Sequence, residues 1–253
     1  MNFNAKMIFL WPSFVWKWLR LMWKAKSYKR NPDGLFPMER NDLLLKYSKK
    51  LIKWFNIKLN VEGYENLPNN GPVLLIPNHK SNIDAILVLA ALESKRKSEG
   101  IPNKMPCFLA KSELQKSKTT KNVLSLLDTI YIDRNNIRAS LASLNEFGKF
   151  IKDYQRFGVI FPEGARIYED GLGEFKPGAF KVALKEYLPI IPVAITDTRD
   201  ALNKKRSKKL PITVKFLPQI KPNNFLSMDT KFLAEKVKGL IANELENLKE
   251  QKN

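Results

Sequence analysis

The sequence predicts an α/β fold with a single mixed sheet flanked by helices and an amphipathic helical segment at its N-terminus. Two observations support this prediction. After residue 60, short apolar runs alternate with segments whose apolar residues recur every three or four positions, a pattern that places helices on the faces of a sheet. The 253 residues are 44% hydrophobic and 27% charged. These values suit one globular domain with a full core and exclude disordered or fibrous chains.

The body of the predicted domain, residues 61–253, alternates strands with helices. Its predicted strands are residues 72–77, 106–110, 129–132, 158–161, 190–195 and 212–217. Its predicted helices are residues 84–92, 119–127, 137–154, 179–187 and a C-terminal stretch from about residue 229. Ile137, Leu141 and Leu144 illustrate the helical pattern, because they follow one another at steps of four and three. In folds of this class, functional side chains collect in the loops at strand ends.

Residues 1–60 form a second predicted unit with a different composition. They hold thirteen Lys or Arg against three acidic residues, together with all five tryptophans of the chain. Tryptophan beside lysine is typical of a membrane–water interface, where the indole ring meets the acyl boundary while its N–H stays hydrated. The segment therefore predicts helices that contact a phospholipid membrane. Helices packed on the body of the protein are the alternative.

The first of these helices is expected to lie in the interface. Its longest uncharged run, residues 7–16, has ten residues and contains Pro12, whereas a spanning helix needs about 20 apolar residues. Lys17 and Arg20 then interrupt the apolar pattern, as in interfacial helices. A tilted span is the alternative, because long cationic side chains can extend to the membrane surface. A second amphipathic helix is expected over residues 43–59, and a cleaved signal peptide is not expected.

Composition also narrows the chemistry. A single cysteine, Cys107, excludes a disulfide framework, and a single histidine excludes a Cys/His zinc cluster, so no metal site is predicted. The chain has 44 basic and 25 acidic residues, a formal net charge of +19. That charge favours a phosphate-bearing partner, which could be nucleic acid, a membrane surface or a small substrate.

The turn after the predicted strand 72–77 contains the only histidine, His79, five residues before Asp84. A neutral imidazole can accept a proton, and a carboxylate that orients it makes it a general base. On one continuous helix the two side chains would point about 140° apart. They meet only if His79 lies in the turn and Asp84 in the first helical turn, with Ser81 or Asn82 as the N-cap. A loop histidine near an aspartate at a helix start is the alternative.

Further cations follow other predicted strands. Arg166 lies on a tight turn formed by Glu163 and Gly164, where its guanidinium could bind a phosphate or carboxylate through two hydrogen bonds. Arg134 and Lys111 also stand at strand ends. A solvated turn and local ion pairs are the alternatives for these three residues.

Taken in order, these segments resemble the sequence blocks of the glycerolipid acyltransferases, and most closely those of the 1-acylglycerol-3-phosphate (lysophosphatidate) acyltransferases. The blocks extend over residues 61–217. They are N-H-x4-D at His79, A-K-x-E-L at Lys111, I-D-R-N at Arg134, F-P-E-G-x-R at Arg166 and I-P-V-A-I at residues 191–195. Each block is weak alone, but all of them in this order are specific.

The resemblance implies acyl transfer from an acyl thioester, either acyl-CoA or acyl-carrier protein, to the sn-2 hydroxyl of lysophosphatidate. The product would be phosphatidic acid, and no bound cofactor is expected. It also implies that His79 removes the hydroxyl proton while Asp84 orients the imidazole. The resemblance further implies that Arg166 holds the phosphate, with Lys111 and Arg134 as supports. Glu163 and Gly164 are implied to shape the loop of this phosphate-binding site. The expected location is the cytoplasmic face of the cell membrane.

Departures from the family pattern leave other acceptors open. Ala165 and Ile167 replace two hydroxyl residues that are usual in the F-P-E-G block, so another lysophospholipid or glycerol 3-phosphate is an alternative acceptor. A glycine often precedes the I-D-R block, and this chain has Asp128 nearby.

Two other classes of protein are alternatives to an enzyme. A basic nucleic-acid-binding protein would explain the charge, but no RRM, KH or helix-turn-helix pattern is present and nucleic acid is not expected as a partner. A silent membrane adaptor is disfavoured because both His79 and Asp84 are present.

Overall fold

The computed structural model describes residues 1–95 and 97–251. Within them, a seven-stranded sheet has the order β1-β7-β6-β2-β5-β3-β4. The strands are β1 Ile57–Glu62, β2 Val73–Pro77, β3 Pro106–Lys111, β4 Ile130–Ile132, β5 Phe157–Val159, β6 Ile190–Ile195 and β7 Leu210–Phe216. β7 pairs antiparallel with β6, and the other pairings are parallel. The predicted single mixed sheet is confirmed.

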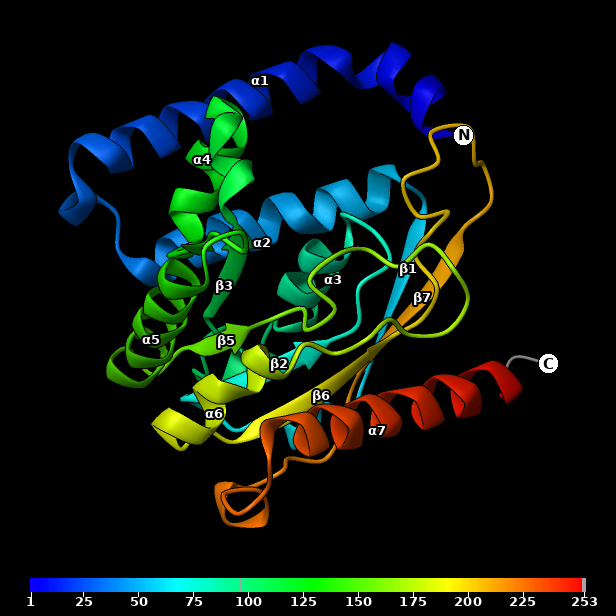
Figure 1. Ribbon diagram of the computed structural model, residues 1–253. Coiled ribbons are helices and arrows are strands. Elements are labelled where there is room, and N and C mark those ends of the chain that lie inside the picture. Colours follow the sequence, from blue (N-terminus) through cyan, green and yellow to red (C-terminus); the bar gives the residue numbers. More distant parts are fainter. Residues whose placement is uncertain (96, 252–253) are drawn as a thin grey trace.

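Helices lie on both faces of this sheet (Figure 1). The α-helices are α1 Phe3–Arg30, α2 Pro37–Trp54, α3 Asp84–Ala91, α4 Lys118–Leu124, α5 Ile137–Asp153, α6 Lys181–Glu186 and α7 Thr230–Glu250. On one face, Leu75 of β2 belongs to a core shared with Leu87 of α3. On the other, Leu74 belongs to a core shared with Phe147 of α5 and Val237 of α7. The sheet is therefore the middle of three layers.

Local sequence explains the principal elements. All five residues of β2 are buried, which is why this strand is a continuous apolar run without alternation. α5 begins after Asn136, whose Oδ1 accepts a hydrogen bond from the Ala139 N–H at 3.0 Å. α7 begins after Asp229, whose Oδ2 accepts one from the Lys231 N–H at 3.2 Å. Such side-chain caps satisfy N–H groups that the first helical turn leaves free.

The N-terminal helices α1 and α2 differ in how many of their apolar side chains are buried in the core. α2 contributes Leu44, Leu45 and Ile52 to the core, so it is part of the body of the protein. α1 contributes Leu21 and Ala25. A series of large apolar side chains on α1 is exposed, comprising Ile8, Phe9, Trp11, Val15, Trp16, Trp18, Leu19 and Trp23. Among the described residues, no helix combines the length and apolar character needed to cross a membrane.

The sheet starts earlier in the chain than the predicted boundary at residue 60, which falls inside β1. The amphipathic helix expected over residues 43–59 ends at Trp54, and Asn56 turns the chain with a φ of 52°. From there Ile57, Leu59 and Val61 alternate with polar residues, the pattern of a strand with one buried face. β1 occupies one end of the sheet, paired with β7.

The parallel strands β2, β5, β3 and β4 are neighbours in the sheet. Their carboxyl ends therefore point to the same edge, and the loops that follow them lie close together. These loops contain His79, Glu163 and Arg134, and Lys111 ends β3. The fold thus brings residues from four distant segments to one edge.

Candidate active site

His79 lies in the turn between β2 and α3, and its Nδ1 is 2.8 Å from Asp84 Oδ2. Asp84 is the first residue of α3 and is fully buried, whereas the His79 side chain is 19% exposed. The contact predicted between these residues is present. Because Nδ1 is bonded to the carboxylate, Nε2 is the ring nitrogen left to accept a proton from a group reaching the site.

The Asp84 carboxylate has three further hydrogen-bond donors. Oδ2 accepts bonds from the N–H of Lys80 at 2.7 Å and of Ser81 at 2.8 Å. Oδ1 accepts one from the Thr198 hydroxyl at 2.6 Å. The prediction that a polar side chain caps α3 is wrong, because Ile83 occupies the N-cap position without a side-chain bond. The carboxylate that orients His79 closes the turn instead.

The loop after β5 clamps the backbone of His79. The His79 N–H donates to Glu163 Oε2 at 2.7 Å, and the His79 carbonyl accepts a bond from the Ile167 N–H at 2.9 Å. Glu163 Oε1 accepts a bond from the Gly173 N–H at 3.0 Å. Burial raises the pKa of Glu163, and these N–H donors oppose the shift. Glu163 therefore ties the two ends of loop 163–173 to the histidine turn.

Two more contacts make the histidine turn rigid. The imidazole lies against the ring of Phe161, with centroids 4.3 Å apart and planes at 33°. Asn78 joins β2 to β6 through two hydrogen bonds with the backbone of Ile195. Asn78 Nδ2 donates to the Ile195 carbonyl at 3.0 Å, and Asn78 Oδ1 accepts a bond from the Ile195 N–H at 2.8 Å. The ring is thereby held in a defined orientation at the edge of the sheet.

The cations at this edge have different surroundings. Arg134 lies beside Gly164, where an added Cβ would be 3.4 Å from Arg134 Nη1. Gly164 has a φ of +74°, which favours glycine. Burial lowers the pKa of Arg134, and the charge of Glu113 opposes that shift. Lys111, at the end of the neighbouring strand, forms a 2.8 Å ion pair with Glu113.

Arg166 is exposed, and its guanidinium carbon is 5.5 Å from the centroid of the Tyr168 ring. It directly precedes Ile167, which bonds the His79 carbonyl. His79 thus bonds directly to Asp84 and Glu163, and Arg134 lies against Gly164. Arg134, Arg166 and Lys111 are all exposed residues at the same edge.

Sequence reasoning missed several residues of this site. Thr198 reaches Asp84 from the loop after β6, and Lys80 is buried with its Nζ 2.7 Å from the Glu169 carbonyl. Arg199 donates to the Tyr168 carbonyl at 2.9 Å and to Asp170 at 2.8 Å. Residues 196–199 are polar and directly follow an apolar strand, which is a signal of a functional loop. The residues that they contact could not be predicted, because those contacts depend on the order of the strands in the sheet.

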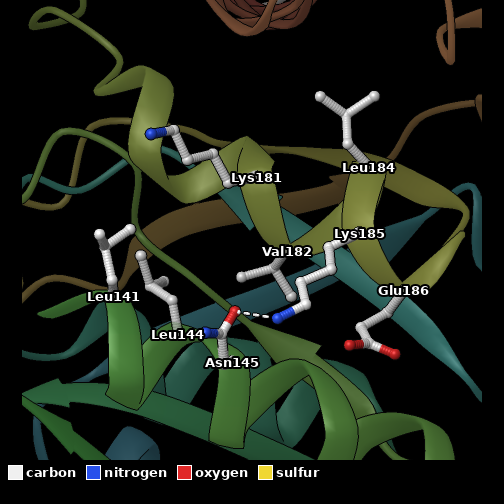
Figure 2. Close-up of a pocket in the computed structure, with 8 residues that line it drawn as sticks. All are labelled: Leu141, Leu144, Asn145, Lys181, Val182, Leu184, Lys185 and Glu186. Carbon is white, nitrogen blue, oxygen red and sulfur yellow. Dashed lines mark hydrogen bonds between the residues drawn. The ribbon is translucent and has the colours of Figure 1, made fainter.

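Two surface hollows lie elsewhere on the molecule. One, between α5 and α6, has a volume of about 410 Å³. Figure 2 shows the side chains that line it, among them Lys185, whose Nζ donates to Asn145 Oδ1 at 2.8 Å. The other, of about 740 Å³, lies between β1, β7 and α7. Neither is lined by a predicted site residue. The described part of the chain contains no group of three His, Cys, Asp or Glu placed to hold a metal ion.

Comparisons with known proteins bear on this site. The family model described as Acyltransferase matches residues 58–196. A probable 1-acyl-sn-glycerol-3-phosphate acyltransferase of Mycoplasma pneumoniae is 31% identical over 91% of this chain and 87% of its own length. The protein of the same description from Mycoplasma genitalium is 30% identical over 92% of this chain and 87% of its own.

A solved structure extends the likeness to the whole fold. The crystal structure of the 1-acyl-sn-glycerophosphate (LPA) acyltransferase PlsC from Thermotoga maritima superposes with a TM-score of 0.71. The two chains are 22% identical, and the match covers 98% of this chain and 95% of the other. The two chains therefore share one fold.

Proposed function

Since this chain belongs to the acyltransferase family, and within it to the 1-acyl-sn-glycerol-3-phosphate acyltransferases, we propose that it acylates the sn-2 hydroxyl of 1-acylglycerol 3-phosphate. The donor is an acyl thioester, acyl-CoA or acyl-carrier protein, and the product is phosphatidic acid. The observation that carries the proposal is the His79–Asp84 pair, 2.8 Å apart at the sheet edge where Arg134 also lies.

The reaction begins with proton transfer to His79. Nε2 removes the proton from the acceptor hydroxyl as its oxygen attacks the thioester carbonyl, and Asp84 stabilises the imidazolium through Nδ1–H. When the tetrahedral intermediate collapses, the C–S bond breaks and the leaving thiolate takes the proton from His79. The acyl group passes directly between substrates, so neither an enzyme nucleophile nor a bound cofactor or metal is required.

The acceptor phosphate is assigned to the cations at the same edge. Arg134 and Arg166 can each offer a planar pair of N–H donors, and Lys111 adds a mobile positive charge. Gly164 lets the loop pass close to Arg134, since its backbone conformation disfavours a side chain. Glu163 shapes the loop from a buried position and does not meet the phosphate.

The substrate is a lipid, so the protein works at a membrane surface. The exposed tryptophans of α1 and the basic residues between them, such as Lys17 and Arg20, fit a helix lying in the interface. The positive net charge then serves lipid and substrate phosphates, with no role for nucleic acid. The cytoplasmic leaflet is the proposed location, because both thioester donors are made on that side.

A second acceptor is favoured by one specific observation. Ile167 stands where a hydroxyl residue is usual, and it packs on Gly173, with Cδ1 2.5 Å from the position of an added Cβ there. Ile167 therefore stabilises the loop and supplies no donor to a phosphate. This loss favours another lysophospholipid whose phosphate is a diester, because a diester carries less negative charge and needs fewer donors, whereas glycerol 3-phosphate has the same phosphate monoester as 1-acylglycerol 3-phosphate.

A direct assay separates these acceptors. Purified protein is incubated with 1-acylglycerol 3-phosphate, glycerol 3-phosphate or lysophosphatidylcholine, each with labelled acyl-CoA or labelled acyl-carrier protein. The proposal predicts labelled phosphatidic acid from the first acceptor. Label only in the product of another acceptor would contradict the assigned substrate, and label in no lipid would contradict the reaction.

A further inference from the structure

The Asp84 carboxylate has an unequal distribution of hydrogen bonds between its oxygens. Oδ2 accepts hydrogen bonds from His79 and from two backbone N–H groups, whereas Oδ1 accepts one from the Thr198 hydroxyl at 2.6 Å. Asp84 is 0% and Thr198 1% exposed, so water does not readily replace this donor. Loss of the hydroxyl would leave a buried carboxylate oxygen without its charge-assisted partner, a costly situation in a protein interior.

Thr198 is fixed independently of Asp84. Its carbonyl accepts a hydrogen bond from the Ala201 N–H at 3.0 Å. The next residue, Arg199, donates to Asp197 in the same loop and to Asp170 in the loop after β5. The hydroxyl is consequently held in place before substrate arrives, as preorganised catalytic sites require.

From this geometry we propose that Thr198 is a positioning residue for acyl transfer, and that its hydroxyl holds Asp84 in the orientation that binds His79 Nδ1–H. The inference rests on the proposed function, in which His79 is the general base. It assigns to residue 198 a role that acts through Asp84, without contact with substrate. Thr198 reaches Asp84 from 114 residues further along the chain, so the pair couples the loop after β6 to the histidine turn.

The test uses Thr198→Val, which keeps the side-chain shape and removes the hydroxyl. Because His79 is the only histidine, ¹⁵N-histidine labelling gives a single set of imidazole signals. In the wild-type protein an Nδ1–H resonance shifted downfield is expected. In Thr198→Val this resonance should broaden or move upfield, and kcat should fall roughly 10-fold or more, while the KM for 1-acylglycerol 3-phosphate changes less than about twofold.

Two variants serve as controls. Thr198→Ser restores a hydroxyl and should recover both the resonance and most of kcat. Thr196→Val removes a hydroxyl from the same loop, one that accepts a bond from the Thr213 N–H at 2.9 Å and does not serve Asp84. It should leave the His79 signals unchanged. If Thr198→Val does not fold, Thr198→Ala removes the same hydroxyl and is measured in its place, with the same change in the Nδ1–H resonance and the same loss of kcat expected.

The inference is overturned if Thr198→Val keeps the wild-type Nδ1–H resonance and a kcat within about twofold of wild type. It is also overturned if Thr196→Val perturbs the His79 signals equally. Failure of the proposed function has a different signature: the wild-type protein would transfer no acyl group, while the imidazole spectra would still decide whether Thr198 orients Asp84.

Discussion

At the residue scale, Glu163 shows how a buried charge can organise a loop. Its two carboxylate oxygens accept the N–H of His79, 84 residues earlier in the chain, and the N–H of Gly173, ten residues later. Burial raises the pKa of Glu163, so the site must offset desolvation of the carboxylate through these donors. The residue belongs to the framework of the site, and its removal should be felt in folding stability as well as in turnover.

Glu163→Ala should destabilise the protein by about 1–3 kcal/mol, because it removes the buried acceptor of two partly buried N–H groups, those of His79 and Gly173. Urea unfolding measures the change. Glu174→Ala is the matched control on the same loop, since Glu174 is 68% exposed on its side chain and pairs with Lys176 at the surface; it should change stability by less than about 0.5 kcal/mol. Equal effects of the two substitutions would argue against a structural role for Glu163.

Asp128 lies before the I-D-R block, a region in which the family often has a glycine, and its conformation accounts for this difference. It adopts a φ of 49°, the left-handed conformation that glycine occupies easily and aspartate tolerates. Its carboxylate also binds Arg40 of α2 at 2.6 Å. The aspartate therefore keeps the turn that a glycine would make and adds a link to the N-terminal helices.

At the element scale, α1 combines a small buried face with a large exposed apolar one. Leu21 and Ala25 join the core, while Trp11, Trp16 and Trp23 are 58%, 59% and 67% exposed. Removing the whole helix would disturb the core as well as the surface. Substitution of the exposed tryptophans alone is the cleaner way to test membrane contact.

The triple variant Trp11→Ser, Trp16→Ser, Trp23→Ser should bind anionic phospholipid vesicles roughly 10-fold or more weakly than wild type, because it loses apolar area that enters the interface. Co-sedimentation measures the binding, and added salt should weaken what remains if lysines contribute. Phe232→Ser, at a 61% exposed position on α7, is the control and should bind as wild type. Wild-type binding by the triple variant would remove α1 as the membrane contact.

Most elements could be predicted from local pattern, and β1 shows where such prediction fails. Ile57, Leu59 and Val61 alternate with polar residues, but they directly follow a helical stretch of similar composition. The helix predicted over residues 43–59 is therefore too long at its C-terminal end, because α2 ends at Trp54 and β1 begins at Ile57. Propensity does not locate such a boundary; pairing with β7, about 150 residues away, decides it.

At the scale of the whole molecule, the sheet order could not be predicted from the sequence. The His79–Asp84 contact was accessible because a turn followed by a helix is local geometry. The contacts of Asp84 with Thr198, and of His79 with Glu163, need β2 to lie between β5 and β6. Only the assembled fold shows that the buried supports of the site come from both neighbouring strands.

The central claim is that His79 is the general base, and turnover by purified His79→Ala tests it most directly. With 1-acylglycerol 3-phosphate and the preferred acyl thioester, kcat should fall about 10²–10⁴-fold, the usual contribution of a general base. The unfolding midpoint and vesicle binding should stay close to wild type, which shows that the loss is chemical. Undiminished turnover by a folded, membrane-bound His79→Ala protein would contradict the account.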